Sequence, residues 1–240
     1  MTPTETVSLC AQNNALWCDA VLSVAGARTK FHNDYWFADG KQLPLYPNLV
    51  TLNNRSGPDL ISALKALPLG AAVKDSFDCL ELKHRGFEKL FGGTWLFRPA
   101  QSSKKPPVSS DWQKVMTLDA FSKWLPAWNA NETLHHVFSP KLIKAAAIEF
   151  AMIMDGEAIK AGCTLNQGPK CDGKNLIGLS NVFYRKKWLY GALRSLLEPY
   201  SHHPVCTYES DEEILPVYRQ LGFQDCGDLA IWVKVKPQDS

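Results

Sequence analysis

Two segments in the last quarter of the chain combine residue types that could hold a phosphorylated ligand and supply a proton. A basic run, Arg185-Lys186-Lys187, follows the β-like residues 176–183 at the expected start of a helix. The first turn of a helix has unpaired N–H groups and a positive dipole end, so it binds anions, and cationic side chains add to this. About thirty residues later, Tyr218 precedes Leu221-Gly222-Phe223. A phenol with an ordinary pKa of about 10 is protonated at neutral pH and suits general-acid catalysis.

The order and spacing of these segments resemble the second half of a GNAT-type, acyl-CoA-dependent N-acetyltransferase, over residues 117–234. The resemblance implies acetyl-CoA as cosubstrate, with its pantetheine arm on one strand and its pyrophosphate on the helix start. It also implies that Tyr218 protonates the leaving thiolate. The implied cofactor-binding residues are Asn181, Val182, Phe183, Arg185, Lys186, Lys187 and Trp188.

The phosphate loop departs from the family pattern, which reads Arg or Gln, two residues, Gly, one residue, then Gly or Ala. Aligned on Arg185, the two small positions fall on Trp188 and Tyr190, and bulky side chains there change how closely the backbone approaches phosphate. Gly191 and Ala192 follow directly, which leaves a shifted register open. The departure supports an alternative, a GNAT-like binding or interaction module without catalysis.

Other chemistry has less support in the sequence. Four acids are candidates by position for a general base toward an acceptor amine, and no motif selects among them: Glu149, Glu209, Asp211 and Glu212. The histidine pairs do not reach the ligand count of a zinc site, so no metal is expected. Phosphate-binding P-loop and dinucleotide-binding glycine motifs are absent from the sequence.

Composition indicates a folded protein whose net charge is too small to attract a highly charged partner. The 240 residues are 45% hydrophobic, enough to bury a sizeable core, and 26 basic against 24 acidic residues leave a net charge of +2. Nucleic acid and anionic membrane are therefore not expected as partners. The seven scattered cysteines form no Cys-x-x-Cys pair, and the start lacks a leader pattern, so a soluble cytoplasmic protein with reduced thiols is expected. The sequence does not indicate an oligomeric state.

A polar stretch with two adjacent prolines, residues 101–110, predicts a linker between residues 1–100 and residues 111–240. Both parts end with Gly-Phe, a short turn, and an apolar strand with Trp and a terminal cation, at residues 86–98 and 222–234. This repeat suggests a diverged duplication, in which the first part is a degenerate GNAT-like half-copy. Each ending is predicted to be a β-hairpin, the first around Gly92-Gly93.

Periodicity and turn residues predict an α+β protein, a mixed sheet with helices packed on it. Asp155-Gly156 marks a hairpin. The main predicted helices are residues 14–24, 186–197 and 212–221, and the main predicted strands are residues 148–154, 158–165, 176–183 and 205–208. The functional hypothesis is acetyl transfer from acetyl-CoA, within a ternary complex, to an unidentified small-molecule or peptide amine.

Overall fold

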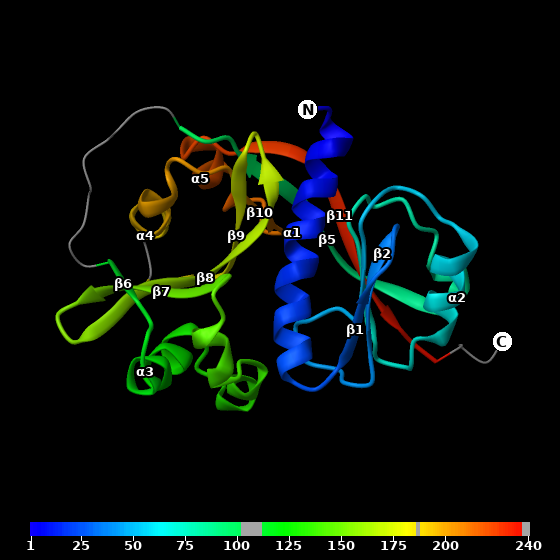
Figure 1. The fold of residues 1–240 in the computed structure, drawn as a ribbon, viewed down its shortest axis with the longest axis horizontal. Coiled ribbons are helices and arrows are strands. Elements are labelled where there is room, and N and C mark those ends of the chain that lie inside the picture. The colour runs from blue at the N-terminus through cyan, green and yellow to red at the C-terminus, as the bar shows by residue number, and fades with distance from the viewer. Residues whose placement is uncertain (102–111, 186–187, 237–240) are drawn as a thin grey trace.

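The computed structural model describes residues 1–101, 112–185 and 188–236. Nearly all of the predicted linker, and the basic residues Lys186 and Lys187, lie outside this part of the chain. The described strands form one mixed sheet in the order β1-β2-β3-β4-β11-β5-β10-β9-β8-β7-β6 (Figure 1). This arrangement confirms the predicted α+β class, whereas the division into two domains stays a prediction.

The elements have the following bounds. The strands are β1 (Arg28–Phe31), β2 (Tyr35–Asp39), β3 (Leu49–Thr51), β4 (Ala72–Asp75), β5 (Phe87–Arg98), β6 (Trp112–Lys114), β7 (Ile148–Asp155), β8 (Ala158–Cys171), β9 (Lys174–Tyr184), β10 (Val205–Glu209) and β11 (Gln224–Lys234). The α-helices are α1 (Pro3–Val24), α2 (Pro58–Ala66), α3 (Leu118–Trp128), α4 (Leu189–Leu197) and α5 (Leu215–Gln220). Short 3₁₀ turns are η1 (Lys83–Arg85), η2 (Glu132–Val137), η3 (Pro140–Lys144) and η4 (Glu198–Tyr200).

Strands from the two ends of the chain alternate at the centre of the sheet. β5 lies between β10 and β11, and β11 lies between β4 and β5. β5 and β11 pair antiparallel along almost their whole length, from Phe87 opposite Lys234 to Phe97 opposite Gln224. The sheet is therefore continuous because each end of the chain contributes a strand to the other.

The predicted terminal hairpins are wrong, because residues 87–98 and 224–234 are each a single strand. Gly92 and Gly93 are extended residues in the middle of β5, opposite Ala230 and Leu229. A Cβ at Gly93 would lie 3.1 Å from the Glu209 carbonyl oxygen, so this glycine allows β10 to approach closely. The glycines that signalled a turn instead serve close packing between strands.

Helix α1 starts eleven residues before the predicted helix. It crosses the middle of the molecule, with β1 and β2 to one side of it and β8 and β9 to the other (Figure 1). Thr2 and Glu5 form a capping box, in which each side chain accepts from the backbone N–H of the other residue, and Pro3 stands in the first turn. The helix ends before Gly26, whose φ of +96° favours glycine. The capping box was the sequence signal for the true start.

Helices α4 and α5 are both shorter than predicted. α4 begins at Leu189 rather than at residue 186, with Trp188 as its N-cap. α5 begins at Leu215 with Pro216 in its first turn, because turns capped by the carboxylates of Glu209 and Asp211 precede it. The strands predicted around Asp155-Gly156 and at residues 176–183 and 205–208 are confirmed in β7, β8, β9 and β10.

Asn13 fixes α1 on the sheet. Its side chain is 1% exposed, its Nδ2 donates to the Leu176 carbonyl at 3.0 Å, and its own carbonyl accepts from Asn166 Nδ2 at 3.0 Å. The amide occupies the space where Gly168 of β8 and Gly178 of β9 lack side chains. Both glycines are therefore needed for the helix to dock.

Gly178→Ala is expected to lower the free energy of unfolding by about 1–3 kcal/mol, because the new Cβ would overlap Asn13 Oδ1 and Asn166 Oδ1. Urea unfolding followed by circular dichroism measures the change. Gly92→Ala is the matched control, since its Cβ would come no closer than 3.6 Å to another residue, the Leu229 carbonyl oxygen, and an alanine within a strand should not lower the stability. Equal stability of the two variants would contradict the docking role of Gly178.

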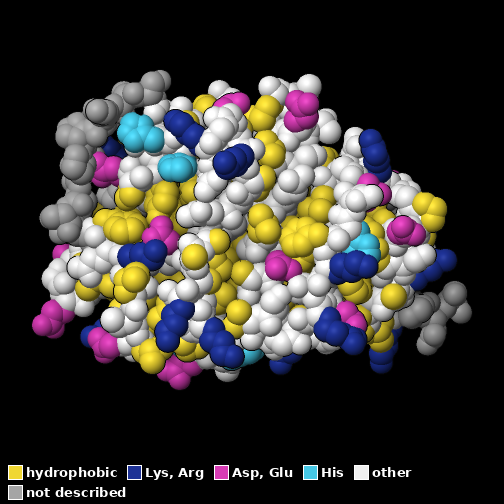
Figure 2. Space-filling model, in the orientation of Figure 1, with side chains coloured by type: hydrophobic (Ala, Val, Ile, Leu, Met, Phe, Trp, Pro, Cys, Tyr) yellow, Lys and Arg dark blue, Asp and Glu magenta, His cyan; other side chains and the backbone are white. Residues whose placement is uncertain are grey.

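On the face shown in Figure 2, Lys and Arg side chains intermingle with Asp and Glu side chains and do not gather into one field. Among the described residues, no helix is both long and apolar enough to cross a membrane.

Candidate functional site

The strands β9 and β10 part from each other and open a cleft. They pair in parallel only at Ile177 with Val205 and at Gly178 with Cys206. Beyond Gly178, residues 179–184 of β9 have no ladder partner on this side among the described strands. Unpaired backbone N–H and C=O groups along a strand edge can bind an extended, amide-containing ligand.

A bulge in β9 marks the start of this open edge. The register with β8 shifts between Ser180, opposite Thr164, and Phe183, opposite Gly162. Asn181 lies in the bulge with φ of +53°, in the left-handed region that asparagine tolerates better than most residues. Its Nδ2 donates to Thr164 Oγ1 at 2.8 Å, so the bulge is held by a side-chain hydrogen bond.

A cavity of about 290 Å³ occupies the cleft, and residues from both the N-terminal and the C-terminal part of the chain line it. Asn181, Val182 and Tyr218 line it from the C-terminal part. Tyr46 and Lys74 line it from the N-terminal part. Three of the residues that the sequence predicted for catalysis or cofactor binding therefore line one cavity. The lining residues from the N-terminal part were not predicted.

Tyr218 points from α5 into the sheet and is 3% exposed. Its ring packs edge-on against Phe223, with centroids 5.3 Å apart. Burial, with a smaller contribution from the nearby Glu209 carboxylate, raises the pKa of the Tyr218 phenol well above its ordinary value. The phenol therefore keeps its proton throughout the neutral range.

Phe183 and Arg185 lie away from this cavity. Phe183 packs edge-on against Trp124, with centroids 5.3 Å apart, and its ring fills the space over Gly162. The Arg185 guanidinium contacts the Asp155 carboxylate at 3.2 Å, and both side chains are about half exposed. An exposed pair of this kind contributes at most about 1 kcal/mol, so an anionic ligand could compete for Arg185.

Trp188 covers the start of α4. Its indole lies so close to Gly191 that a Cβ there would overlap the ring, and Lys160 Nζ lies 4.1 Å from the ring centroid. Gly191 is one of the small residues that left a shifted register open, and here its free space is filled by Trp188. The indole, with Lys160 beside its ring, therefore covers the first turn of the helix at Gly191.

No family model matches the sequence, and no curated protein matches it. Solved structures do. A GNAT-family protein from Novosphingobium aromaticivorans aligns over 94% of this chain and 99% of its own, with a TM-score of 0.60 and 11% identity. A GCN5-related N-acetyltransferase from Kribbella flavida aligns over 94% and 96%, with a TM-score of 0.59 and 13% identity. The chain has the GNAT fold. The predicted resemblance is confirmed at the level of the fold, and it extends over both ends of the chain rather than over residues 117–234 alone.

Within this GNAT fold, Lys74 is the cleft residue that sequence reasoning missed. It is 3% exposed, its Nζ donates to Asn14 Oδ1 at 2.8 Å and lies 4.0 Å from the Tyr208 ring centroid. Among the described residues, no carboxylate lies within ion-pair distance of it. The signal in the sequence was weak, a single lysine in the short apolar stretch that becomes β4.

Of the four acids proposed for the GNAT general base, Glu209 lines the cleft. Its Oε1 accepts from the backbone N–H groups of Ser210 at 2.8 Å and Asp211 at 3.0 Å, which fixes the carboxylate at the end of β10. Glu149 contacts Lys114 and Tyr200 on another part of the sheet. Asp211 and Glu212 are exposed and do not line the cavity.

Proposed function

We propose that this protein is an acyl-CoA-dependent N-acetyltransferase, which transfers acetyl from acetyl-CoA to an amine within a ternary complex. The observation that carries the proposal is the open edge of β9 beside Tyr218. The pantetheine arm contains two amide groups, and residues 179–184 offer it unpaired backbone donors and acceptors. This placement leads the thioester into the cavity where Tyr218 lies.

The chemistry needs one nucleophile and one proton donor. The acceptor nitrogen attacks the thioester carbonyl, the new C–N bond forms, and the C–S bond breaks with its electron pair going to sulfur. Tyr218 then gives its proton to the thiolate and recovers one from solvent. Glu209 takes the proton that the amine loses. Holding both substrates in one cleft supplies much of the rate.

Lys74 defines the acceptor side of the cleft. A buried ammonium without a carboxylate partner is unfavourable unless a ligand supplies the negative charge. The cation lines the same cavity as Asn181 and is held in place by Asn14. The acceptor is therefore an amine that also carries an anionic group, such as a carboxylate.

Calorimetric titration of acetyl-CoA and of CoA into the protein tests the cofactor. Saturable binding is expected, and ligand at 100 times its dissociation constant should add about 2.7 kcal/mol to the stability measured by thermal unfolding. Absence of binding at millimolar ligand would contradict the transferase proposal. It would instead favour a GNAT-fold module without catalysis, an alternative that the packing of Trp188 on Gly191 supports.

Trp188→Ala is expected to tighten CoA binding about fivefold. Removing the indole from Gly191 frees the first turn of α4 for the pyrophosphate, and one added hydrogen bond to a charged group corresponds to roughly 1 kcal/mol or more. The same titration measures the change. Tyr190→Ala is the control, because Tyr190 is exposed at the same helix start. Weaker binding in Trp188→Ala would show that the indole itself holds the cofactor.

A further inference from the structure

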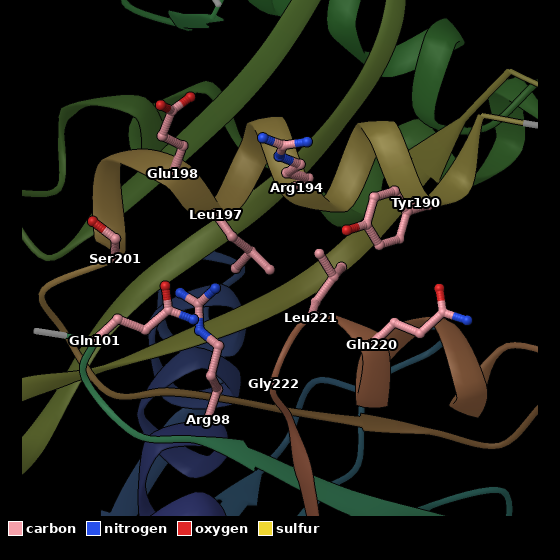
Figure 3. Close-up of a pocket in the computed structure, with 10 residues that line it drawn as sticks. All are labelled: Arg98, Gln101, Tyr190, Arg194, Leu197, Glu198, Ser201, Gln220, Leu221 and Gly222. Carbon is pink, nitrogen blue, oxygen red and sulfur yellow. The ribbon is translucent and has the colours of Figure 1, made fainter. Parts of the chain in front are cut away.

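A second cavity, of about 350 Å³, lies between α4, α5 and the end of β5 (Figure 3). It shares no lining residue with the cleft. Arg98, at its base, pairs with Val205 at the beginning of β10, whereas the cleft opens at Glu209 at the end of that strand. The two positions are about 13 Å apart along β10. This cavity is therefore a separate place on the molecule.

Arg98 is the unusual residue of this cavity. It is 5% exposed, and Figure 3 shows its guanidinium pointing up from the base toward the space between α4 and Leu221. Among the described residues, its Nε and Nη2 have no hydrogen-bond partner. Burial lowers the pKa of Arg98 to about 10, so the group is still charged at neutral pH. A buried cation with two unpaired donors is costly, and native structures rarely leave one.

Nε and Nη2 form one edge of the guanidinium, which donates two parallel hydrogen bonds to a single oxyanion. The chain shows this use elsewhere, because Arg219 donates from Nε at 3.1 Å and from Nη2 at 2.6 Å to the two oxygens of Asp225. The same edge of Arg98 is the one without a partner. Its missing partner therefore has the geometry of a carboxylate or a phosphate.

The repeated strand endings provide an internal comparison. Lys234, the terminal cation of β11, lies over the Phe87 ring, and Arg98, the terminal cation of β5, lies over the Phe223 ring. Lys234 Nζ donates to three carbonyls at the end of α2, those of Leu64, Lys65 and Leu67. Arg98 lies beside the end of α4, yet in the described part of the chain its Nε and Nη2 have no such acceptor. The protein satisfies one of the two cations internally and leaves the other facing a cavity.

The charges around the cavity favour an anion. Arg194 of α4 also lines it, and Glu198 is the carboxylate in its wall. Neither arginine is within ion-pair distance of Glu198 in the described structure, and Glu198 Oε1 is itself buried without a donor. The lining therefore contains two cations and one carboxylate.

We propose that this cavity is a binding site for the phosphate or carboxylate group of a small molecule, which the Nε and Nη2 donors of Arg98 hold. Its volume is in the range of small-ligand sites. Arg194 adds a second positive charge to the lining. The site is independent of the acetyl-transfer proposal, because it uses different residues and a different part of β10.

Titration with inorganic phosphate and, separately, with acetate tests the site, at ionic strength held constant with sodium chloride. Saturable calorimetric binding and a rise in the melting temperature are expected for at least one anion, and the stronger anion identifies the chemistry. Arg98→Lys keeps the charge and most of the stem but lacks the fork, so at least a tenfold loss of affinity is expected. Arg219→Lys, which changes the fork that already binds Asp225, should leave the affinity unchanged.

A measurement on the unmodified protein covers the case in which Arg98→Lys folds poorly. Phosphate or acetate should shift one arginine Nε–H resonance in a ¹H–¹⁵N spectrum, with the same midpoint as the calorimetric titration. Equal affinity in Arg98→Lys, or a linear response to both anions without saturation and without a shifted arginine resonance, would overturn the proposal. Retained acetyl-CoA binding in Arg98→Lys is expected in either case and separates this result from a failure of the cleft.

Discussion

Replacing Tyr218 by phenylalanine is expected to lower kcat for acetyl transfer by about 100-fold or more and to leave acetyl-CoA affinity unchanged. A positioned general acid contributes roughly 10²- to 10⁴-fold, and Phe removes the proton while it keeps the ring that packs on Phe223. Steady-state kinetics and calorimetric titration on the same preparation separate the two quantities. Full turnover in the variant would refute the role of Tyr218.

Tyr35→Phe is the matched control. Tyr35 is a buried tyrosine on β2 that does not line the cleft, so its variant should turn over at the normal rate. An equal loss in both variants would point to a general effect on the sheet rather than to proton transfer. Thermal unfolding of each variant shows whether the sheet is intact.

The expected pH dependence of turnover in the unmodified protein follows from the same residue. In the proposed mechanism Tyr218 acts in its protonated form. Burial raises its pKa above the ordinary value of about 10, so this form is fully present at neutral and moderately alkaline pH. Turnover should rise with pH as the acceptor amine loses its proton, and Tyr218 should cause no decline below about pH 10. A decline between pH 7 and 9 that disappears in Tyr218→Phe would contradict this assignment.

Lys74→Met is expected to raise KM for an acceptor that carries a carboxylate by about 10- to 100-fold. A hydrogen bond to a charged group contributes roughly 1.5–3 kcal/mol, and Met keeps the length of the side chain without the charge. An amino acid and its amide, compared as acceptors, measure the effect, since the amide lacks the negative charge. In the variant, KM should be about equal for the amino acid and its amide.

Lys89→Met is the control for loss of a positive charge. Lys89 forms a half-exposed pair with Asp78 and does not line the cleft, so KM should not change. A preference of the unmodified protein for the amide over the amino acid would contradict the acceptor class. It would leave the proposed acetyl transfer itself untouched, because Tyr218 and the β9 edge are separate from Lys74.

Local signals in the sequence were sufficient to predict the strands on the β9 side of the cleft. Asp155-Gly156 located the β7–β8 hairpin, and the apolar run before Arg185 located β9. Each signal depends on neighbours in the chain, which is why short-range patterns reveal it. The hairpins predicted at Gly92-Gly93 and Gly222-Phe223 were wrong because these positions depend on contacts between distant segments. A glycine that allows a distant strand to pack closely cannot be distinguished, from the local sequence, from a glycine in a turn.

The candidate site divides in the same way. Tyr218 and Asn181 come from segments with recognisable neighbours, and both line the cleft. Lys74 reaches it because β4 joins the sheet through β11, a pairing that no local pattern announces. Arg98 was visible only as the charged end of a strand, and its missing partners became evident only with the surrounding helices in place.

The interleaving of β5 and β11 has a consequence for how the chain is made. β4 needs β11 as its neighbour, and β11 is synthesised well over a hundred residues later. At usual ribosome speeds the interval is on the order of 10 s, during which β4 has an open edge in the nascent chain. Neither end of the protein can complete its own part of the sheet by itself, so a nascent chain that stops before β11 exposes an unpaired strand to chaperones and proteases. Quality control in the cell would therefore act on this protein as one unit.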